Sequence, residues 1–181
     1  MMQNLAKTLS VIKVGGAVLE DEASLSSFLD RFVALPGLKI LVHGGGRAAT
    51  KLSEKLGVYS KLVDGRRITD VETLEIVTMV YGGLVNKKTV AILQAKGCNA
   101  SGFTGADCNL ITASKRPVQQ IDYGFVGDIS SVNKQAFAGL LESGITPVIA
   151  PLTHDGNGQL LNTNADTMAS AIAVAMAESY A

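Results

Sequence analysis

The chain has 181 residues, of which 47% are hydrophobic and 18% are charged. This composition is typical of a globular fold with a sizeable buried core, and it excludes intrinsic disorder. Lysine plus arginine and aspartate plus glutamate are equal at 16 each, so no net charge draws the chain to nucleic acid or to an anionic membrane.

The first elements form a predicted strand–helix–strand unit. An apolar run over residues 11–14 predicts a buried strand. Helical spacing of apolar residues over 25–33 predicts a helix, which ends at Pro36-Gly37. A second apolar run over 39–42 predicts another strand. The unit is typical of parallel strands joined by a crossover helix.

A short helix and a hairpin are expected next. The helix runs from about residue 47 to 56 and closes at a glycine. Residues 58–63 and 66–68 then predict two strands around Asp64-Gly65, a dipeptide that strongly favours a two-residue hairpin turn. This hairpin interrupts the alternation of strands and helices.

The second half opens with a long amphipathic helix. Asp70 is its predicted cap, Gly82-Gly83 loosen it, and it ends before Gly97. We then expect a β ribbon over residues 100–114, a helix over 133–142 and an apolar strand over 145–150. A turn over 155–158 and a last helix over 165–181 follow. The last helix has no C-terminal cap, so we expect the chain to stop within a longer domain.

The alternation predicts an α/β fold with a mostly parallel sheet and helices on both faces, whose ligands gather at the carboxyl ends of the strands. No apolar run reaches membrane-spanning length, and the first ten residues lack a signal-peptide pattern. We therefore expect a cytoplasmic protein that does not bind membranes. Cys98 and Cys108 show no metal-ligand spacing, so both are expected to be reduced and no metal site is predicted.

Two glycine turns stand at the ends of the first two strands. Lys13 precedes Gly15 and Gly16, and the second strand leads into the triple glycine 44–46. Glycines let the backbone approach a ligand closely, and the amide groups of such turns bind anions. A lysine within an apolar strand is costly without a partner, which favours a phosphate-binding role for Lys13.

The triple glycine also fits a different function. Gly44, Gly46 and Ala49 satisfy the loose dinucleotide-binding pattern, with Asp64 twenty positions after the first glycine. A nicotinamide-binding domain is therefore an alternative. It is weakened because Asp64 belongs to a hairpin turn rather than to a strand end, and because it leaves Lys13 without a function.

Polar residues of the hairpin and of the last helix complete the candidate set. Arg67 is suited to a bidentate contact with a carboxylate, although Arg66 and Arg67 also fit a solvated charge pair. Asn162 offers a donor and an acceptor, whereas Asn164 also fits a simple helix cap and Asp166 a favourable acid in the first helical turn.

Four motifs in this order, over residues 13–16, 43–46, 65–69 and 161–166, resemble those of the amino acid kinase family, and most closely its members that phosphorylate N-acylated glutamate. The resemblance implies an open αβα sandwich over 1–181 with a β-hairpin lid. It covers roughly the first two thirds of such enzymes, so the nucleotide-binding C-terminal part is expected to be absent. It also implies a homodimer formed through the helix after Asp70.

By this resemblance, ATP with Mg²⁺ would phosphorylate the side-chain carboxylate of N-acetyl-L-glutamate, or of a related N-acyl-L-glutamate, in arginine biosynthesis. A glutamate side chain has a pKa of about 4.3 and is already ionised, so no general base is needed. The implied roles are catalytic for Lys13 and Asp166, substrate-binding for Gly45, Gly46, Arg67 and Asn162, phosphate-binding for Gly15, Gly16 and Gly44, and supporting for Asn164.

Two further functions stay open from the sequence. The chain as given could bind acylglutamate without catalysis, or it could be a sister kinase acting on aspartate, glutamate, carbamate or a nucleoside monophosphate. The sequence leaves the acyl group undecided between acetyl and a longer group such as succinyl. In the family that the chain resembles, arginine inhibition goes with an added N-terminal helix that joins dimers into hexamers. Only about ten residues precede the first strand here, so the resemblance implies a dimer that arginine does not inhibit.

Overall fold

The computed structural model describes residues 8–59, 61–63 and 66–180. Its central sheet has four strands in the order β1-β2-β8-β5, and every adjacent pair is parallel. The strands span β1 Leu9–Val14, β2 Leu38–His43, β8 Thr146–Ile149 and β5 Ala100–Phe103. The predicted mostly parallel sheet is therefore confirmed, and its first two strands pair as the predicted crossover unit requires.

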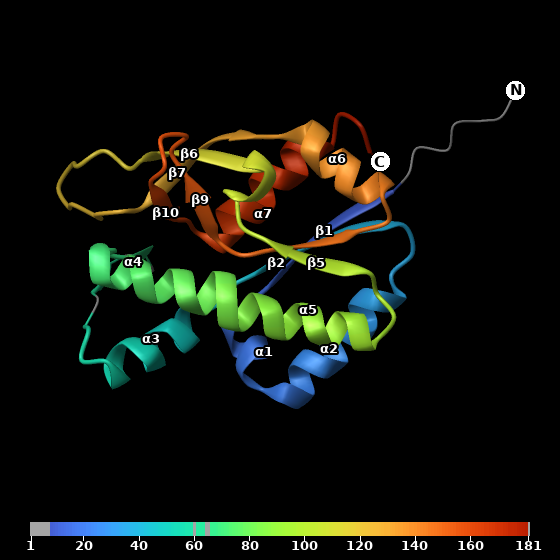
Figure 1. Ribbon diagram of the computed structural model, residues 1–181, viewed down its shortest axis with the longest axis horizontal. Coiled ribbons are helices and arrows are strands. Elements are labelled where there is room, and N and C mark those ends of the chain that lie inside the picture. The colour runs from blue at the N-terminus through green and yellow to red at the C-terminus, as the bar shows by residue number, and fades with distance from the viewer. Residues whose placement is uncertain (1–7, 60, 64–65, 181) are drawn as a thin grey trace, which may run out of the picture.

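Helices cover both faces of this sheet (Figure 1). One layer contains α1 Gly16–Glu20, α2 Glu22–Ala34, α3 Gly46–Lys55, α4 Val71–Val77, the π-helix η1 Thr78–Val85 and α5 Asn86–Ala95. The opposite layer contains α6 Lys134–Glu142 and α7 Ala165–Met176. The three layers confirm the αβα sandwich.

A second four-stranded sheet lies beside α7, with the order β10-β9-β6-β7. Its strands span β6 Ile111–Lys115, β7 Gly127–Val132, β9 Leu152–His154 and β10 Leu160–Asn162. The predicted β ribbon over 100–114 is wrong, because β5 belongs to the central sheet and β6 to this one. Between them the short helix η2 Asp107–Asn109 turns the chain, with positive φ angles at Cys108 and Asn109.

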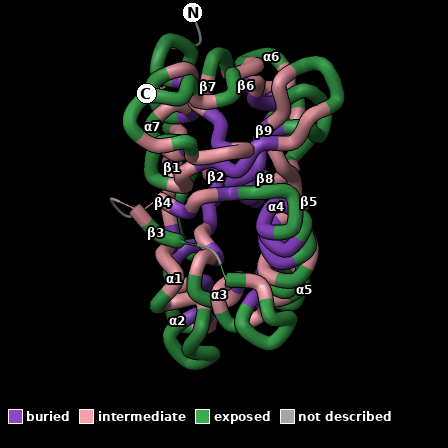
Figure 2. The backbone as a smooth tube through the Cα atoms, turned by 90° about the vertical axis from the view of Figure 1, so that its left-hand side faces the viewer, coloured by how far each residue is buried: buried purple, intermediate pink, exposed green. Residues whose placement is uncertain are grey.

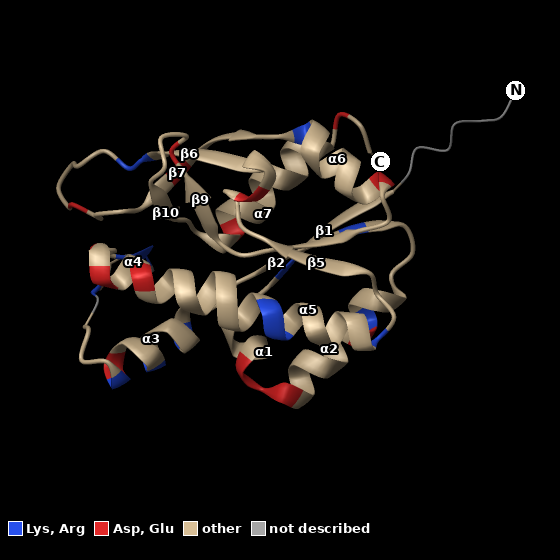
Figure 3. Cartoon of the chain, viewed as in Figure 1, with Lys and Arg blue, Asp and Glu red and all other residues tan. Residues whose placement is uncertain are grey.

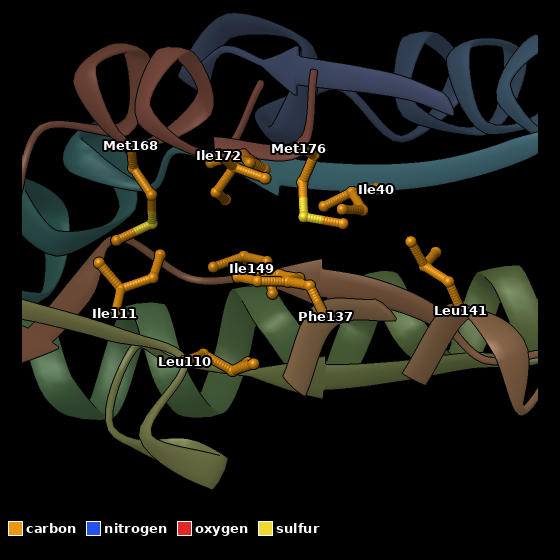
Figure 4. Packing of buried hydrophobic residues seen from close by; sticks show 10 residues of the cluster. Ile40, Leu110, Ile111, Phe137, Leu141, Ile149, Met168, Ile172 and Met176 are labelled. Atoms are coloured by element: carbon orange, nitrogen blue, oxygen red, sulfur yellow. The ribbon is translucent and has the colours of Figure 1, made fainter. Parts of the chain in front are cut away.

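A hydrophobic cluster joins the central sheet to the layer of α6 and α7. Figure 4 shows Met168, Ile172 and Met176 of α7 above Ile149, with Ile40 beside Met176. The cluster is 0–3% exposed and comprises Ile40, Val42, Leu110, Ile111, Phe137, Leu141, Ile149, Met168, Ile172 and Met176. Buried backbone follows the central strands in Figure 2. This packing fixes the start of α7 against the carboxyl ends of β1 and β2.

The hairpin and the helix after it lie where the sequence predicts them, but the first hairpin strand is shorter than the predicted 58–63. β3 Leu62–Val63 pairs antiparallel with β4 Arg66–Arg67, and the predicted turn at Asp64-Gly65 lies outside the described residues. The side chain of Asp70 accepts a hydrogen bond of 2.8 Å from the backbone N–H of Thr73, which confirms the cap. The predicted loosening at the double glycine is the wider π-helical turn η1.

The continuous helix 71–95 corrects the expectation about membrane-spanning length. It has 25 residues and is long and apolar enough, by length and composition, to cross a membrane. Within the fold, 44% of its most apolar window is buried, and the helix packs against β5, β8 and α2. Core helices of soluble proteins share this composition, so the segment fits its place in the sandwich.

Candidate functional site

A pocket of about 150 Å³ opens between the second glycine turn, the β3–β4 hairpin and the start of α7. Six predicted site residues line it, namely Gly44, Gly45, Gly46, Arg67, Asn162 and Asn164. The other lining residues are Leu62, Arg66, Tyr81, Val126, Pro151, Thr163 and Ala165. Residues 44 and 162, which are far apart in the sequence, thus meet in one cavity.

The two glycine turns lie side by side at the ends of β1 and β2. The backbone N–H of Gly44 donates to the carbonyl of Val14 over 3.0 Å, and a Cβ placed on Gly44 would lie 3.7 Å from the nitrogen of Gly16. Gly15 caps α1 and Gly45 caps α3. The first N–H groups of a helix have no partner within it, so the turn that starts α3 presents amide donors beside the pocket.

Lys13 and Asp166 form an ion pair next to these turns. The Nζ of Lys13 lies 3.0 Å from Oδ1 of Asp166, and their side chains are 30% and 70% exposed. A Cβ on Gly15 would lie 3.7 Å from the same Nζ. Neither charged residue lines the pocket, and neither do Gly15 and Gly16. The predicted residues therefore form two adjoining groups, one around the pocket and one around Lys13.

Arg67 is held in a defined position at the pocket wall. It is 7% exposed, and its Nη2 donates to the carbonyl of Gly46 over 3.0 Å and to Oγ1 of Thr50 over 2.7 Å. Arg66 lines the same pocket but is less buried. Both arginines of β4 therefore reach the pocket, although neighbouring residues of a strand normally point to opposite faces. The described lining contains two guanidinium groups and no aspartate or glutamate. Its charge therefore favours an anionic ligand.

The two asparagines differ in their contacts. Asn162 is 8% exposed, and its Nδ2 donates over 3.0 Å to Oγ1 of Thr69, which in turn donates to the carbonyl of Arg67. Asn164 caps α7, because its Oδ1 accepts from the backbone N–H of Thr167 over 2.9 Å. The capping interpretation of Asn164 is confirmed, while Asn162 is oriented by the hairpin that carries Arg67.

Tyr81 joins the pocket from η1, and no sequence motif marks it as a site residue. Its side chain is 5% exposed and lines the pocket, and a Cβ on Gly45 would lie only 2.6 Å from its ring carbon Cδ1. Burial raises the pKa of Tyr81, and the charge of Arg67 opposes that rise. A lone tyrosine in an apolar helix gives no sequence signal of this contact with a distant glycine.

Charged side chains lie mainly on the helices and connecting loops rather than on the central strands (Figure 3). In the described ranges, no group of three or more histidine, cysteine, aspartate or glutamate residues is placed to hold a metal ion. The site therefore offers an ammonium group, guanidinium groups and backbone amides. These groups bind and stabilise negative charge, as phosphoryl transfer requires.

The model of the amino acid kinase family matches residues 8–178. The chain therefore belongs to the amino acid kinase family. Its similar relatives include an acetylglutamate kinase of Bacteroides fragilis, which is 57% identical over 176 residues, covering 97% of this chain and 67% of that protein. An acetylglutamate kinase of Cytophaga hutchinsonii is 59% identical over 174 residues, covering 96% of this chain and 66% of that protein.

A solved structure agrees with this assignment. The crystal structure of smu.665 from Streptococcus mutans UA159 has a TM-score of 0.82 and 30% sequence identity to this chain. The match covers 93% of this chain and 69% of that one. The family assignment leaves the nicotinamide-binding alternative without support, since the triple glycine now belongs to a kinase fold.

Proposed function

We propose that the chain is an acetylglutamate kinase, which transfers the γ-phosphoryl group of ATP to the side-chain carboxylate of N-acetyl-L-glutamate in cytoplasmic arginine biosynthesis. The observation that carries this proposal is the cationic pocket around Arg67, which adjoins the Lys13–Asp166 pair across two glycine turns. An anionic acceptor in the pocket would thus lie next to the groups that neutralise a phosphoryl donor.

The pocket is suited to an acylated amino acid. Arg67 would bind the α-carboxylate in a planar bidentate contact, in which the carboxylate replaces one of the present Nη2 contacts to Gly46 and Thr50. Asn162 would bind the acyl amide with Oδ1 as acceptor and the second hydrogen of Nδ2 as donor, while the first hydrogen donates to Thr69. The amides of Gly45 and Gly46 would hold the oxygens of the reacting carboxylate.

The neighbouring group is suited to phosphoryl transfer. Lys13 would neutralise charge on the transferring phosphoryl oxygens, and Asp166 would orient it through the 3.0 Å ion pair. Gly15, Gly16 and Gly44 would give the phosphate room and amide donors, with Asn164 fixing the turn into α7. Mg²⁺ would arrive on the ATP phosphates. The acceptor carboxylate is ionised at neutral pH, so the site needs no general base.

Trapping of the acyl phosphate tests the proposal. The chain, MgATP and N-acetyl-L-glutamate are incubated with hydroxylamine, which converts an acyl phosphate into a hydroxamate. A hydroxamate that requires both substrates supports the kinase. Saturable binding of N-acetyl-L-glutamate without product would indicate an acylglutamate-binding fragment. A parallel panel of aspartate, glutamate, carbamate and a nucleoside monophosphate would identify a sister kinase, and N-succinyl-L-glutamate would define the acyl group.

A homodimer is part of the same proposal. The helix 71–95 carries Val71, Met79 and Leu84, which are 57%, 54% and 63% exposed. These side chains give the helix apolar surface that a partner could cover. A second copy of this helix would bury them in an isologous contact.

A further inference from the structure

A buried polar network lies behind the second glycine turn. His43 is 0% exposed and Asn86 is 1% exposed. The Nδ1 of His43 lies 2.7 Å from the carbonyl oxygen of Gly44, and its Nε2 lies 3.0 Å from Nδ2 of Asn86. The same Nδ2 donates over 2.9 Å to the carbonyl of Val148 in β8. The network therefore joins the turn to α5 and to the central sheet.

These contacts fix the tautomer of His43. The carbonyl of Val148 can only accept, so the Asn86 atom that faces it must be the amide nitrogen. That nitrogen also faces Nε2 of His43, which must then accept. The ring proton is therefore on Nδ1 and donates to the carbonyl of Gly44. The pKa of His43 is lowered to about 4, mainly because burial disfavours its charged form, so the ring is neutral at neutral pH.

The carbonyl of Gly44 and the N–H of Gly45 belong to one peptide group. No cis peptide bond occurs in the described part of the chain, so this group is trans and its N–H points away from its carbonyl. Holding the carbonyl toward the buried ring therefore directs the Gly45 N–H away from the ring. Gly44 is also held through its own N–H by Val14. A glycine peptide without such contacts would be free to rotate.

We infer that His43 is a positioning residue, which holds the Gly44–Gly45 peptide so that the Gly45 N–H is presented to the anionic acceptor. The inference rests on the proposed function, because it assigns that N–H to the acceptor carboxylate. His43 itself does not line the pocket. Asn86 acts one step further back by fixing the tautomer, and Gly102 makes room for it, since a Cβ at Gly102 would lie 1.8 Å from Oδ1 of Asn86.

Two substitutions separate the two ring nitrogens. In His43→Asn the side-chain amide nitrogen takes the place of Nδ1 and can still donate to Gly44, but the contact with Asn86 is lost. In His43→Gln the terminal oxygen takes the place of Nε2 and can still accept from Asn86, but the donor to Gly44 is lost. Each variant keeps one buried hydrogen bond and loses the other, so they serve as matched controls for folding.

The test compares both variants with the original chain in amide ¹H–¹⁵N spectra and in calorimetric titration with N-acetyl-L-glutamate. In His43→Gln we expect the Gly45 amide resonance to shift or broaden and binding to weaken about tenfold, the effect of one lost hydrogen bond. In His43→Asn we expect the Gly45 resonance and the affinity for N-acetyl-L-glutamate to stay close to those of the original chain. Thermal melts verify that each variant is folded.

The inference is overturned if His43→Gln keeps the Gly45 resonance and the affinity, or if the two variants are impaired equally, since a merely structural histidine would show the latter. Failure of the proposed function looks different. The original chain would then not bind N-acetyl-L-glutamate, while the Gly45 resonance would still report whether His43 positions the peptide.

Discussion

At the residue scale, Lys13 is proposed to stabilise the transferring phosphoryl group, although its ion pair with Asp166 contributes little to the stability of the fold. Its ion pair with Asp166 is partly exposed, and such pairs contribute little to stability. Replacing Lys13 by Ala should therefore change the free energy of unfolding by less than about 1 kcal/mol. In an enzyme that also carries the nucleotide-binding part, hydroxamate formation should fall by at least about 100-fold, because charge stabilisation at the phosphoryl group is lost.

Binding of N-acetyl-L-glutamate should survive in Lys13→Ala, because Lys13 does not line the pocket. The control is Lys51→Ala, which removes another exposed lysine that is paired with Glu20 over 3.2 Å. This control should leave turnover unchanged. Unchanged turnover in Lys13→Ala would remove Lys13 from the catalytic group.

His43 makes stability depend on pH. The pKa of His43 is about 4 in the folded chain, against an ordinary value of 6.5. Between pH 4 and pH 6.5 the ring is therefore protonated in the unfolded chain and neutral in the folded chain. Stability should be full above about pH 6.5 and fall as the pH drops toward 4. The share of His43 between pH 7 and pH 5 is about 2 kcal/mol.

Urea unfolding at pH 7 and pH 5 measures this effect. His43→Asn lacks the titrating ring, so it should lose about 2 kcal/mol less than the original chain over the same interval. Burial is the main cause of the lowered pKa, and the charge of Lys87 adds to it. An equal loss in both proteins would contradict a buried neutral histidine.

At the scale of elements, η1 packs so closely on the second glycine turn that position 45 has no room for a side chain. A Cβ at Gly45 would lie 2.6 Å from the ring of Tyr81, so Gly45→Ala must displace the ring or the turn. We expect a loss of stability of about 1–3 kcal/mol and weakened binding of N-acetyl-L-glutamate. Chemical denaturation and calorimetry measure the two effects.

The control for Gly45→Ala is Gly139→Ala in α6. Within the described structure, a Cβ at Gly139 meets no atom within 4 Å, so alanine should stabilise this helix by about 0.5–1 kcal/mol. If Gly45→Ala were as stable as the original chain, the close packing of Tyr81 on the turn would be wrong.

Elements with strong local signals were predictable. The apolar runs of β1, β2 and β8, the cap at Asp70 and the hairpin strands follow from spacing and turn residues. The ribbon over 100–114 was wrongly predicted because two nearby strands favour local pairing. Here β5 instead pairs in parallel with β8, more than forty residues later in the chain, and local sequence carries no trace of that partner.

The candidate site was predictable only in part, for a similar reason. Glycine turns and polar motifs identify residues that approach a ligand, and six of them do line one pocket. The partners of these residues come from elements without a distinctive motif. Tyr81 packs on Gly45 from η1, Thr50 accepts from Arg67, and Asn86 fixes His43, so only the fold reveals them.

At the scale of the whole molecule, the exposed apolar side chains of helix 71–95 predict self-association. Sedimentation equilibrium should give a mass of twice 18.9 kDa for the original chain. Leu84→Glu places a charge at one of these positions and should give the monomer mass, because burying an unpaired charge is costly. Val174→Glu is the control, since Val174 is 75% exposed on α7 in the opposite layer. A dimeric Leu84→Glu protein would place the interface elsewhere.

The central claim is that this fold holds an acylglutamate in the Arg67 pocket, and calorimetric titration with N-acetyl-L-glutamate tests it most directly. We predict saturable binding that weakens about tenfold or more in Arg67→Lys, because an ammonium group cannot replace the bidentate contact. Arg66→Lys should bind nearly as well as the original chain. Absence of binding by the folded chain, or equal binding by Arg67→Lys, would contradict the account.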